Sequence, residues 1–66
     1  MKNNLKVERA IKNITQDELA NEIGVTRQAI NSIELNKYVP STALSLKLSR
    51  YFGKTVNELF TLEESD

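Results

Sequence analysis

Residues 15–35 read TQDELANEIGVTRQAINSIEL, and this stretch decides the fold. Thr15 and Glu18 form a capping-box pattern, in which each side chain accepts the backbone N–H of the other residue at the start of a helix. The spacing of the apolar residues predicts a helix over residues 16–23. Gly24 follows, and it can take the left-handed conformation that ends a helix without steric cost.

A second helix follows after a very short link. Thr26 can cap a helix that runs from Arg27 to about Leu35. Three residues, beginning with Gly, are left to turn the chain, and such a turn is typical of the helix-turn-helix motif. Small and apolar side chains at matched positions would hold the angle between the helices: Leu19, Ala20, Ile23, Val25, Ile30 and Ile33. Residues 16–35 are therefore predicted to form a helix-turn-helix.

The outward face of the second helix carries side chains suited to reading base pairs. Arg27, Gln28 and Asn31, with Ser32 beside them, are expected opposite its apolar positions. In the major groove, Arg can bond guanine bidentately, and Gln or Asn can bond adenine in the same way. Recognition helices of this motif contact bases through their N-terminal residues. Polar residues also cover the outside of any soluble helical bundle, so the prediction of a DNA partner rests on the whole combination.

Two more helices flank the motif. Asn3 or Asn4 can cap a first helix through Asn13, whose apolar positions are Leu5, Val7, Ala10, Ile11 and Ile14. Ser41 can cap a helix over residues 42–52, which is expected to bury, wholly or in part, Leu44, Leu46, Leu48, Tyr51 and Phe52.

The C-terminal end predicts a fifth, short helix. Thr55 and Glu58 form a second capping box before a helix that runs through Phe60. The tail beyond it is expected to include a brief extended piece around Leu62. Residues 1–66 are therefore predicted to form a single all-α domain, a five-helix bundle that contains the helix-turn-helix.

The composition limits the chemistry of the chain. It has 66 residues, with no Cys and no His. Disulfides, thiolate catalysis, the usual zinc sites and imidazole acid–base chemistry are thereby excluded, and neither a cofactor nor a metal is expected. No apolar run reaches the roughly 18 residues of a membrane span. A cytoplasmic protein without membrane contact is expected.

The net charge is zero, but the charges are unevenly distributed. Residues 1–57 hold all nine Lys and Arg against five acidic residues, a balance of +4, and residues 58–66 hold the other four acidic residues. A basic body with an acidic tail can still present a positive face to phosphate. The total charge therefore neither supports nor excludes a nucleic-acid partner.

Several short motifs together indicate a known family. They are LKVER at 5–9, TQDELA at 15–20, GVTRQAI at 24–30, IELNKY at 33–38, PS at 40–41 and ELF at 58–60. With them the chain resembles the Cro and lambda-repressor type of helix-turn-helix domain, also called the XRE family. It is most similar to the short stand-alone bacterial regulators of that family. The motifs are specific in combination, and no single one is.

The resemblance implies a role for each matching residue. Arg27 and Gln28 would be the main base readers, with Asn31 and Ser32 further along the groove. The residues that would contact the DNA backbone are Gln16, Thr26, Asn36, Lys37 and Tyr38. A Lys and a Tyr hydroxyl in the loop after the recognition helix suit phosphate binding on their own chemistry.

The same resemblance also implies an ion pair within the chain and an interface between two chains. Arg9 and Glu34 match positions that form a partly buried ion pair between the first and third helices. The C-terminal end, residues 55–66, matches a dimer interface, and the residues expected there are Val56, Leu59, Phe60 and Leu62. Closure of the monomer core is the competing explanation for Val56 and Leu59.

The sequence leaves three classes of function to compare. The first is a homodimeric transcriptional repressor on an inverted-repeat operator in double-stranded DNA, since a two-fold dimer reads two half-sites about 34 Å apart. The second is a protein-interaction module, such as an antitoxin or adaptor, which the neutral charge and acidic tail favour slightly. The third is an enzyme, for which no nucleophile–base pair, metal ligands or phosphate-binding Gly loop is present, so no catalytic residue is expected.

Overall fold

Four of the five helices begin at a Ser or Thr whose hydroxyl accepts the backbone N–H of the residue three positions later. The structure, a computed structural model, describes residues 1–66. At two of these starts a Glu completes the capping box that the sequence predicts. The four helices are α2 (Gln16–Ile23), α3 (Arg27–Glu34), α4 (Thr42–Phe52) and α5 (Val56–Leu59).

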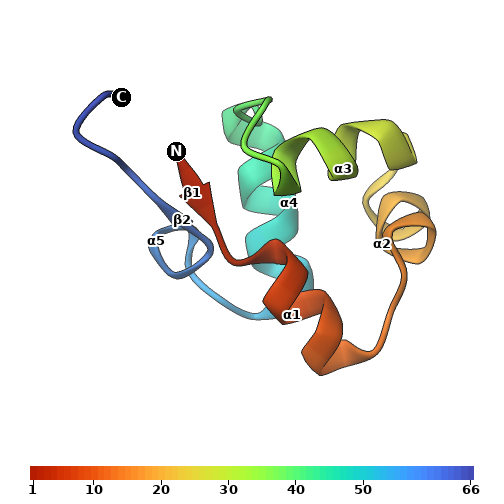
Figure 1. Ribbon diagram of the computed structural model, residues 1–66. Helices are drawn as coiled ribbons and strands as arrows, with labels where there is room; N and C mark the ends of the chain where they lie inside the picture. Colours follow the sequence, from red (N-terminus) through yellow and green to blue (C-terminus); the bar gives the residue numbers. More distant parts are fainter.

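The turn between α2 and α3 depends on the left-handed conformation of Gly24, whose φ is 85°. Its N–H and that of Val25 both donate to the carbonyl of Ala20, at 2.8 and 3.0 Å. The chain therefore leaves α2 at once and re-enters a helix after Thr26. In Figure 1 α3 runs across one side of the molecule, and α2 is seen end-on beside it. The predicted helix-turn-helix is confirmed.

The first helix, α1 (Leu5–Lys12), has a different kind of cap. Asn4 occupies the N-cap position but makes no capping bond with its side chain. The side chain of Asn3 takes that role instead, because its Oδ1 accepts the N–H of Leu5 at 3.1 Å. Asn13, at a φ of 57°, ends the helix in the left-handed region.

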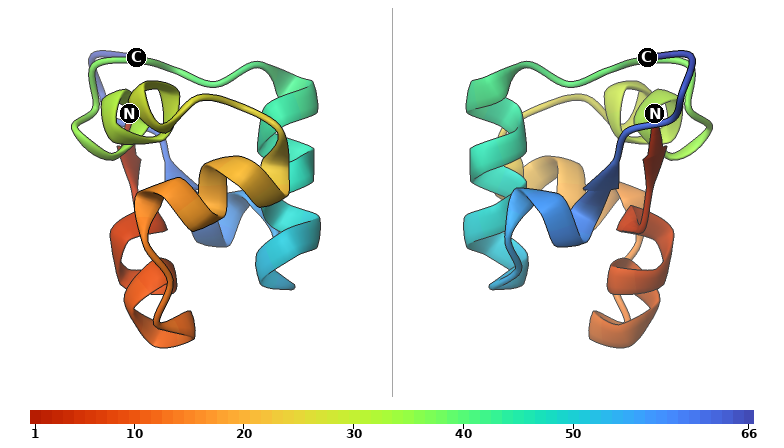
Figure 2. Two further views of the ribbon diagram at one scale, coloured as in Figure 1. Left: turned by 90° about the vertical axis from the view of Figure 1, so that its right-hand side faces the viewer. Right: turned by 90° about the vertical axis from the view of Figure 1, so that its left-hand side faces the viewer.

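A two-stranded antiparallel sheet joins the two ends of the chain. Its strands are β1 (Lys2–Asn3) and β2 (Phe60–Thr61), which lie side by side in Figures 1 and 2. The predicted all-α bundle of five helices is confirmed; the short strand β1, which pairs with the extended C-terminal piece, was not predicted. The extended piece lies just before Leu62 rather than around it, and α5 consequently ends one residue before Phe60.

The core consists of eleven buried apolar side chains drawn from all five helices and from β2. They are Leu5, Leu19, Ala20, Ile23, Ile30, Ile33, Leu44, Leu48, Phe52, Leu59 and Phe60. Four apolar residues that the sequence predicts on inner faces are exposed instead: Val7, Ala10, Ile11 and Leu46. Leu46 lies two positions from both Leu44 and Leu48, and Val7 lies two positions from Leu5. Two positions correspond to about 200° around a helix, so these side chains face away from the core.

The two chain termini lie together, at the end of the molecule opposite α2 (Figure 1). None of the helices combines the length and the apolar character that crossing a bilayer requires.

Candidate nucleic-acid interface

Helix α3 has one buried face and one polar face. Ile30 and Ile33 are almost fully buried against the rest of the domain. Arg27, Gln28 and Asn31 point away from it and are exposed. The apolar face thus anchors α3 to the body, and this leaves the polar side chains facing solvent.

Four polar residues line a shallow hollow of about 410 Å³ at the start of α3. They are Thr26, Arg27, Gln28 and Asn31, and no apolar side chain is among them. Three of the four predicted base readers are therefore brought together. Ser32 does not line the hollow and is half-buried.

Gln16, the first residue of α2, connects this surface to the interior. Its amide nitrogen Nε2 donates to Oδ1 of Asn31 and to Oε1 of Glu34, both at 3.1 Å. Both amide hydrogens are therefore engaged within the protein. A phosphate contact by Gln16, as the resemblance implies, would require this side chain to rearrange, because only its carbonyl oxygen is free.

Arg9 and Glu34 form a bidentate ion pair between α1 and α3. Arg9 Nε lies 2.6 Å from Glu34 Oε2, and Nη2 lies 3.0 Å from Oε1. The third guanidinium nitrogen, Nη1, donates to the carbonyl of Ile14 at 3.0 Å. The hydrogen bonds to the Glu34 carboxylate raise the pKa of Arg9 above its ordinary value. The side chains are only 14% and 5% exposed, so water screens this pair weakly.

The loop after α3 leaves the helix through a Schellman motif. Asn36 has a φ of 61°, its N–H bonds the carbonyl of Ile33, and the N–H of Lys37 bonds the carbonyl of Ser32. This turn places Asn36, Lys37 and Tyr38 on the surface. Each offers a hydrogen-bond donor of the kind that contacts phosphate oxygens.

One residue at this surface was not anticipated from the sequence. Asn3, in β1, donates through Nδ2 to the carbonyl of Ile33 at 2.7 Å and to Oδ1 of Asn36 at 3.0 Å. These contacts join positions 30 and 33 residues apart, so no local pattern could reveal them. The sequence marks Asn3 only as a possible helix cap.

The residues expected in a dimer interface divide into two groups. Leu59 and Phe60 are buried in the monomer core, whereas Val56 is half-buried and Leu62 is 76% exposed. Val56 and Phe60 line two adjoining hollows, and Leu62 lines one of them. Their apolar lining is extended by residues that were not predicted there: Met1, Val39, Pro40 and Leu46. Val39 and Leu46 are among the exposed large apolar side chains.

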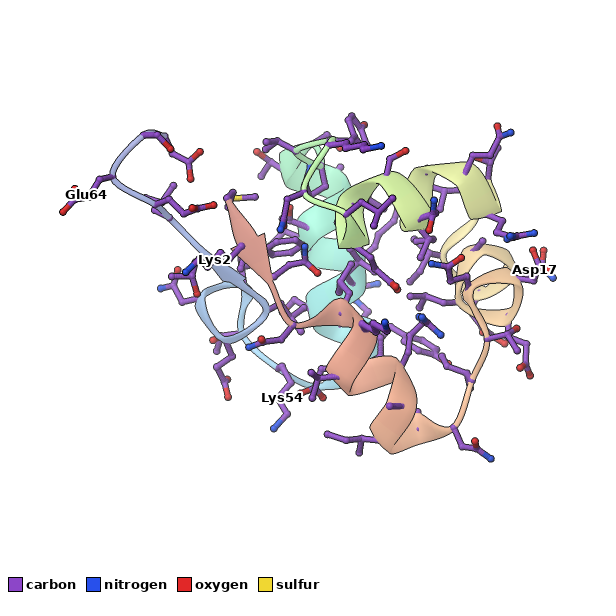
Figure 3. The ribbon with its side chains drawn as sticks, in the orientation of Figure 1. Lys2, Asp17, Lys54 and Glu64 are labelled. Carbon is purple, nitrogen blue, oxygen red and sulfur yellow. The ribbon has the colours of Figure 1, made fainter.

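The acidic tail folds back on the N-terminus. The Met1 ammonium lies 3.1 Å from carboxylate oxygens of both Glu63 and Asp66, which raises its pKa. A hydrogen bond from the N–H of Glu63, together with the ammonium, lowers the pKa of Asp66. In Figure 3 Glu64 lies on this tail, at the end of the molecule opposite Asp17 of α2. The tail charge is therefore kept away from the start of α2.

Comparison with known proteins gives consistent results. A family model described as helix-turn-helix matches residues 5–59. An uncharacterized HTH-type transcriptional regulator of Methanocaldococcus jannaschii is 44% identical over 66 residues, the whole of both chains. The uncharacterized HTH-type transcriptional regulator YgzD of Bacillus subtilis is 41% identical, again over the whole of both chains.

A third relative is longer than this chain. The HTH-type transcriptional activator BcrR of Enterococcus faecalis is 38% identical over 53 residues, which are 80% of this chain but 26% of that protein. Relatives thus occur in an archaeon as well as in bacteria, so the similarity extends beyond the bacterial regulators that the sequence indicated.

Proposed function

Since the chain belongs to the XRE family of helix-turn-helix transcriptional regulators, we propose that it is a homodimeric repressor that binds an inverted repeat through the major groove. The observation that carries this proposal is the hollow at the start of α3. It gathers a guanidinium, two carboxamides and a hydroxyl on one exposed surface. These groups can make the paired hydrogen bonds that distinguish base pairs in the major groove.

The arrangement of α3 fits entry into the groove. An α-helix with its side chains is about 10–12 Å across, and the major groove of B-DNA is about 12 Å wide. Arg27 and Gln28 lie in the first turn of α3, where recognition helices contact base edges. Asn31 and Ser32 lie one turn further on. The flanking positions Thr26, Asn36, Lys37 and Tyr38 would then lie beside the phosphates.

Dimerisation is supported by the apolar surface at the opposite end of the chain. Met1, Val56 and Leu62 line one hollow, and Val39 and Leu46 extend the apolar lining into the adjoining one. This surface does not include the hollow on α3, so both can be used at once. One recognition helix reads few base pairs, and a two-fold dimer doubles the sequence that is read.

Repression follows from occupancy alone. A dimer bound across a promoter blocks access to it without contacting any other protein. The relative BcrR is named an activator, so the direction of regulation needs its own test. In a reporter fused to a promoter with the selected operator, we expect transcription to fall when the protein is produced. A rise would overturn the repressor assignment.

Selection of bound duplexes from a random library, followed by sequencing, tests the proposal as a whole. We expect a consensus of two inverted half-sites whose centres are about one helical turn, or a multiple of it, apart. A single half-site would contradict the dimer. Enrichment of no consensus would favour the protein-interaction module instead.

Lys37→Ala is expected to weaken binding to all duplexes alike. The Lys37 ammonium is exposed beside α3 and would contact phosphate, which carries no sequence information. The slope of log affinity against log salt concentration should become shallower by roughly one per chain. Titrations of the selected operator and of a scrambled duplex at several salt concentrations measure this. Lys54→Ala is the matched control, because Lys54 lies far from α3 (Figure 3). A change in base preference would contradict the phosphate role.

Leu62→Asp is expected to weaken the dimer by roughly 100-fold or more, because one apolar contact worth about 1.5 kcal/mol or more is lost from each chain. Leu62 is 76% exposed in the monomer, so the fold should tolerate the change. Sedimentation equilibrium measures the dissociation constant. Ile11→Asp is the control, since Ile11 is a similarly exposed apolar residue on α1. Dissociation caused by the Ile11 variant and not by the Leu62 variant would place the interface on α1.

A further inference from the structure

Two partly buried carboxamide side chains each donate a hydrogen bond to the oxygen of an exposed carboxamide side chain. Gln16 donates to Oδ1 of Asn31, and Asn3 donates to Oδ1 of Asn36. The two outer residues are exposed and belong to the surface that the proposed function assigns to DNA. A carboxamide has an acceptor end and a donor end, so these contacts decide which end meets the DNA.

The orientation of Gln16 follows from its contact with Glu34. Two nitrogens of Arg9, which can only donate, bond the two carboxylate oxygens of Glu34, so these oxygens act as acceptors. The Gln16 atom that faces them must therefore be the nitrogen. The same nitrogen contacts Asn31, and the Asn31 atom that meets it must be the oxygen. The ion pair thus determines the orientation of Asn31 through Gln16.

The orientation of Asn3 follows from the backbone. Its Oδ1 accepts the N–H of Leu5, and its Nδ2 donates to the carbonyl of Ile33. Backbone N–H groups only donate and carbonyls only accept, so a flipped amide would lose both bonds. The second hydrogen of Nδ2 meets Asn36, whose oxygen is therefore turned inward.

We propose that Gln16 and Asn3 are positioning residues that present Asn31 and Asn36 to DNA as hydrogen-bond donors. Asn31 then reads a guanine in each half-site, and Asn36 binds a phosphate oxygen. This inference rests on the proposed function.

Guanine is the base that fits this donor arrangement. It offers two neighbouring acceptors, O6 and N7, in the major groove, whereas adenine pairs an acceptor with a donor. A carboxamide that is free to turn suits adenine, because it offers both an oxygen and a nitrogen. The oxygen of Asn31 is occupied by Gln16, which leaves its NH₂ group for the base. A phosphate likewise has only acceptors, so the outward nitrogen of Asn36 fits it.

Asn31→Asp tests, with an isosteric change, whether the NH₂ end of the Asn31 amide faces the DNA. One carboxylate oxygen can still accept from Gln16, while the other replaces the outward nitrogen. At one position of each half-site the selected base should change from guanine to cytosine, whose N4 amino group is a donor. Asn21→Asp adds the same charge on α2 at an exposed residue outside the hollow, and it should leave the consensus unchanged.

Gln16→Met tests the positioning role. Without the donor, the Asn31 amide can turn, so adenine should be accepted at that position and the preference for guanine should fall about fivefold to tenfold. Gln16→Lys keeps a donor toward both oxygens and should retain the guanine preference. The bases selected at the positions that Arg27 and Gln28 contact should not change in either variant.

Asn36→Asp tests the phosphate contact proposed for Asn36. Its outward atom becomes an oxygen facing phosphate, so the affinity for all duplexes should fall together and no base preference should move.

The outcomes separate this inference from the proposed function. If the wild-type protein selects no consensus, the proposed function fails. If a consensus exists but Asn31→Asp leaves every base preference unchanged, or if Gln16→Met weakens all duplexes equally, the positioning role is overturned and the DNA-binding surface stands. Should Gln16→Met fail to fold, the Asn31→Asp result alone decides whether the Asn31 amide is oriented as proposed.

Discussion

Arg9→Ala is expected to lower the free energy of unfolding by about 3 kcal/mol. The change leaves the Glu34 carboxylate, which is 5% exposed, without its charged partner and removes the bond to the carbonyl of Ile14. A domain of this size has a total stability on the order of 3–10 kcal/mol, so this change removes roughly a third of it or more. Urea denaturation followed by far-ultraviolet circular dichroism measures the difference.

A double variant separates the charge from the packing. Arg9→Met combined with Glu34→Leu removes both charges and keeps most of the apolar volume, so it should recover most of the lost stability. A loss below about 1 kcal/mol for Arg9→Ala would show that the pair behaves as an ordinary surface ion pair. Equal losses in the single and double variants would contradict the idea that an unpaired buried charge causes the effect.

Gln28→Ala is expected to lower affinity for the selected operator by about 1–3 kcal/mol per half-site and to relax the preference at one base pair. The Gln28 amide is exposed in the first turn of α3 and lines the hollow with Arg27. Loss of its two hydrogen bonds removes discrimination at that base pair, while the phosphate contacts remain. Repeating the library selection and titrating single-base variants of the operator would measure both effects.

Asn21→Ala is the matched control for this change. Asn21 is an exposed carboxamide on α2 and lies outside the hollow. Its replacement should leave both affinity and consensus unchanged. If Gln28→Ala and Lys37→Ala both leave operator binding as it was, the recognition surface proposed for α3 is wrong.

The helices were predictable because their signals are local. Thr15, Thr26, Ser41 and Thr55 each bond a backbone N–H three residues away, and Gly24 ends α2 through its own φ angle. The polar face of α3 was equally predictable, because the apolar spacing of a helix defines both of its faces. The Arg9–Glu34 contact is different in kind. It spans 25 residues, and it was anticipated only through a family resemblance.

The sequence by itself determined the helix-turn-helix and the side chains that its second helix turns outward. Only the tertiary structure decided which face of α1 and α4 is inward, that residues 2–3 pair with residues 60–61, and how Asn3 and Gln16 orient their neighbours. Caps and left-handed turns are formed within about four residues, so the local sequence contains them. Strand pairing and amide orientation depend on groups that meet only after the helices have packed.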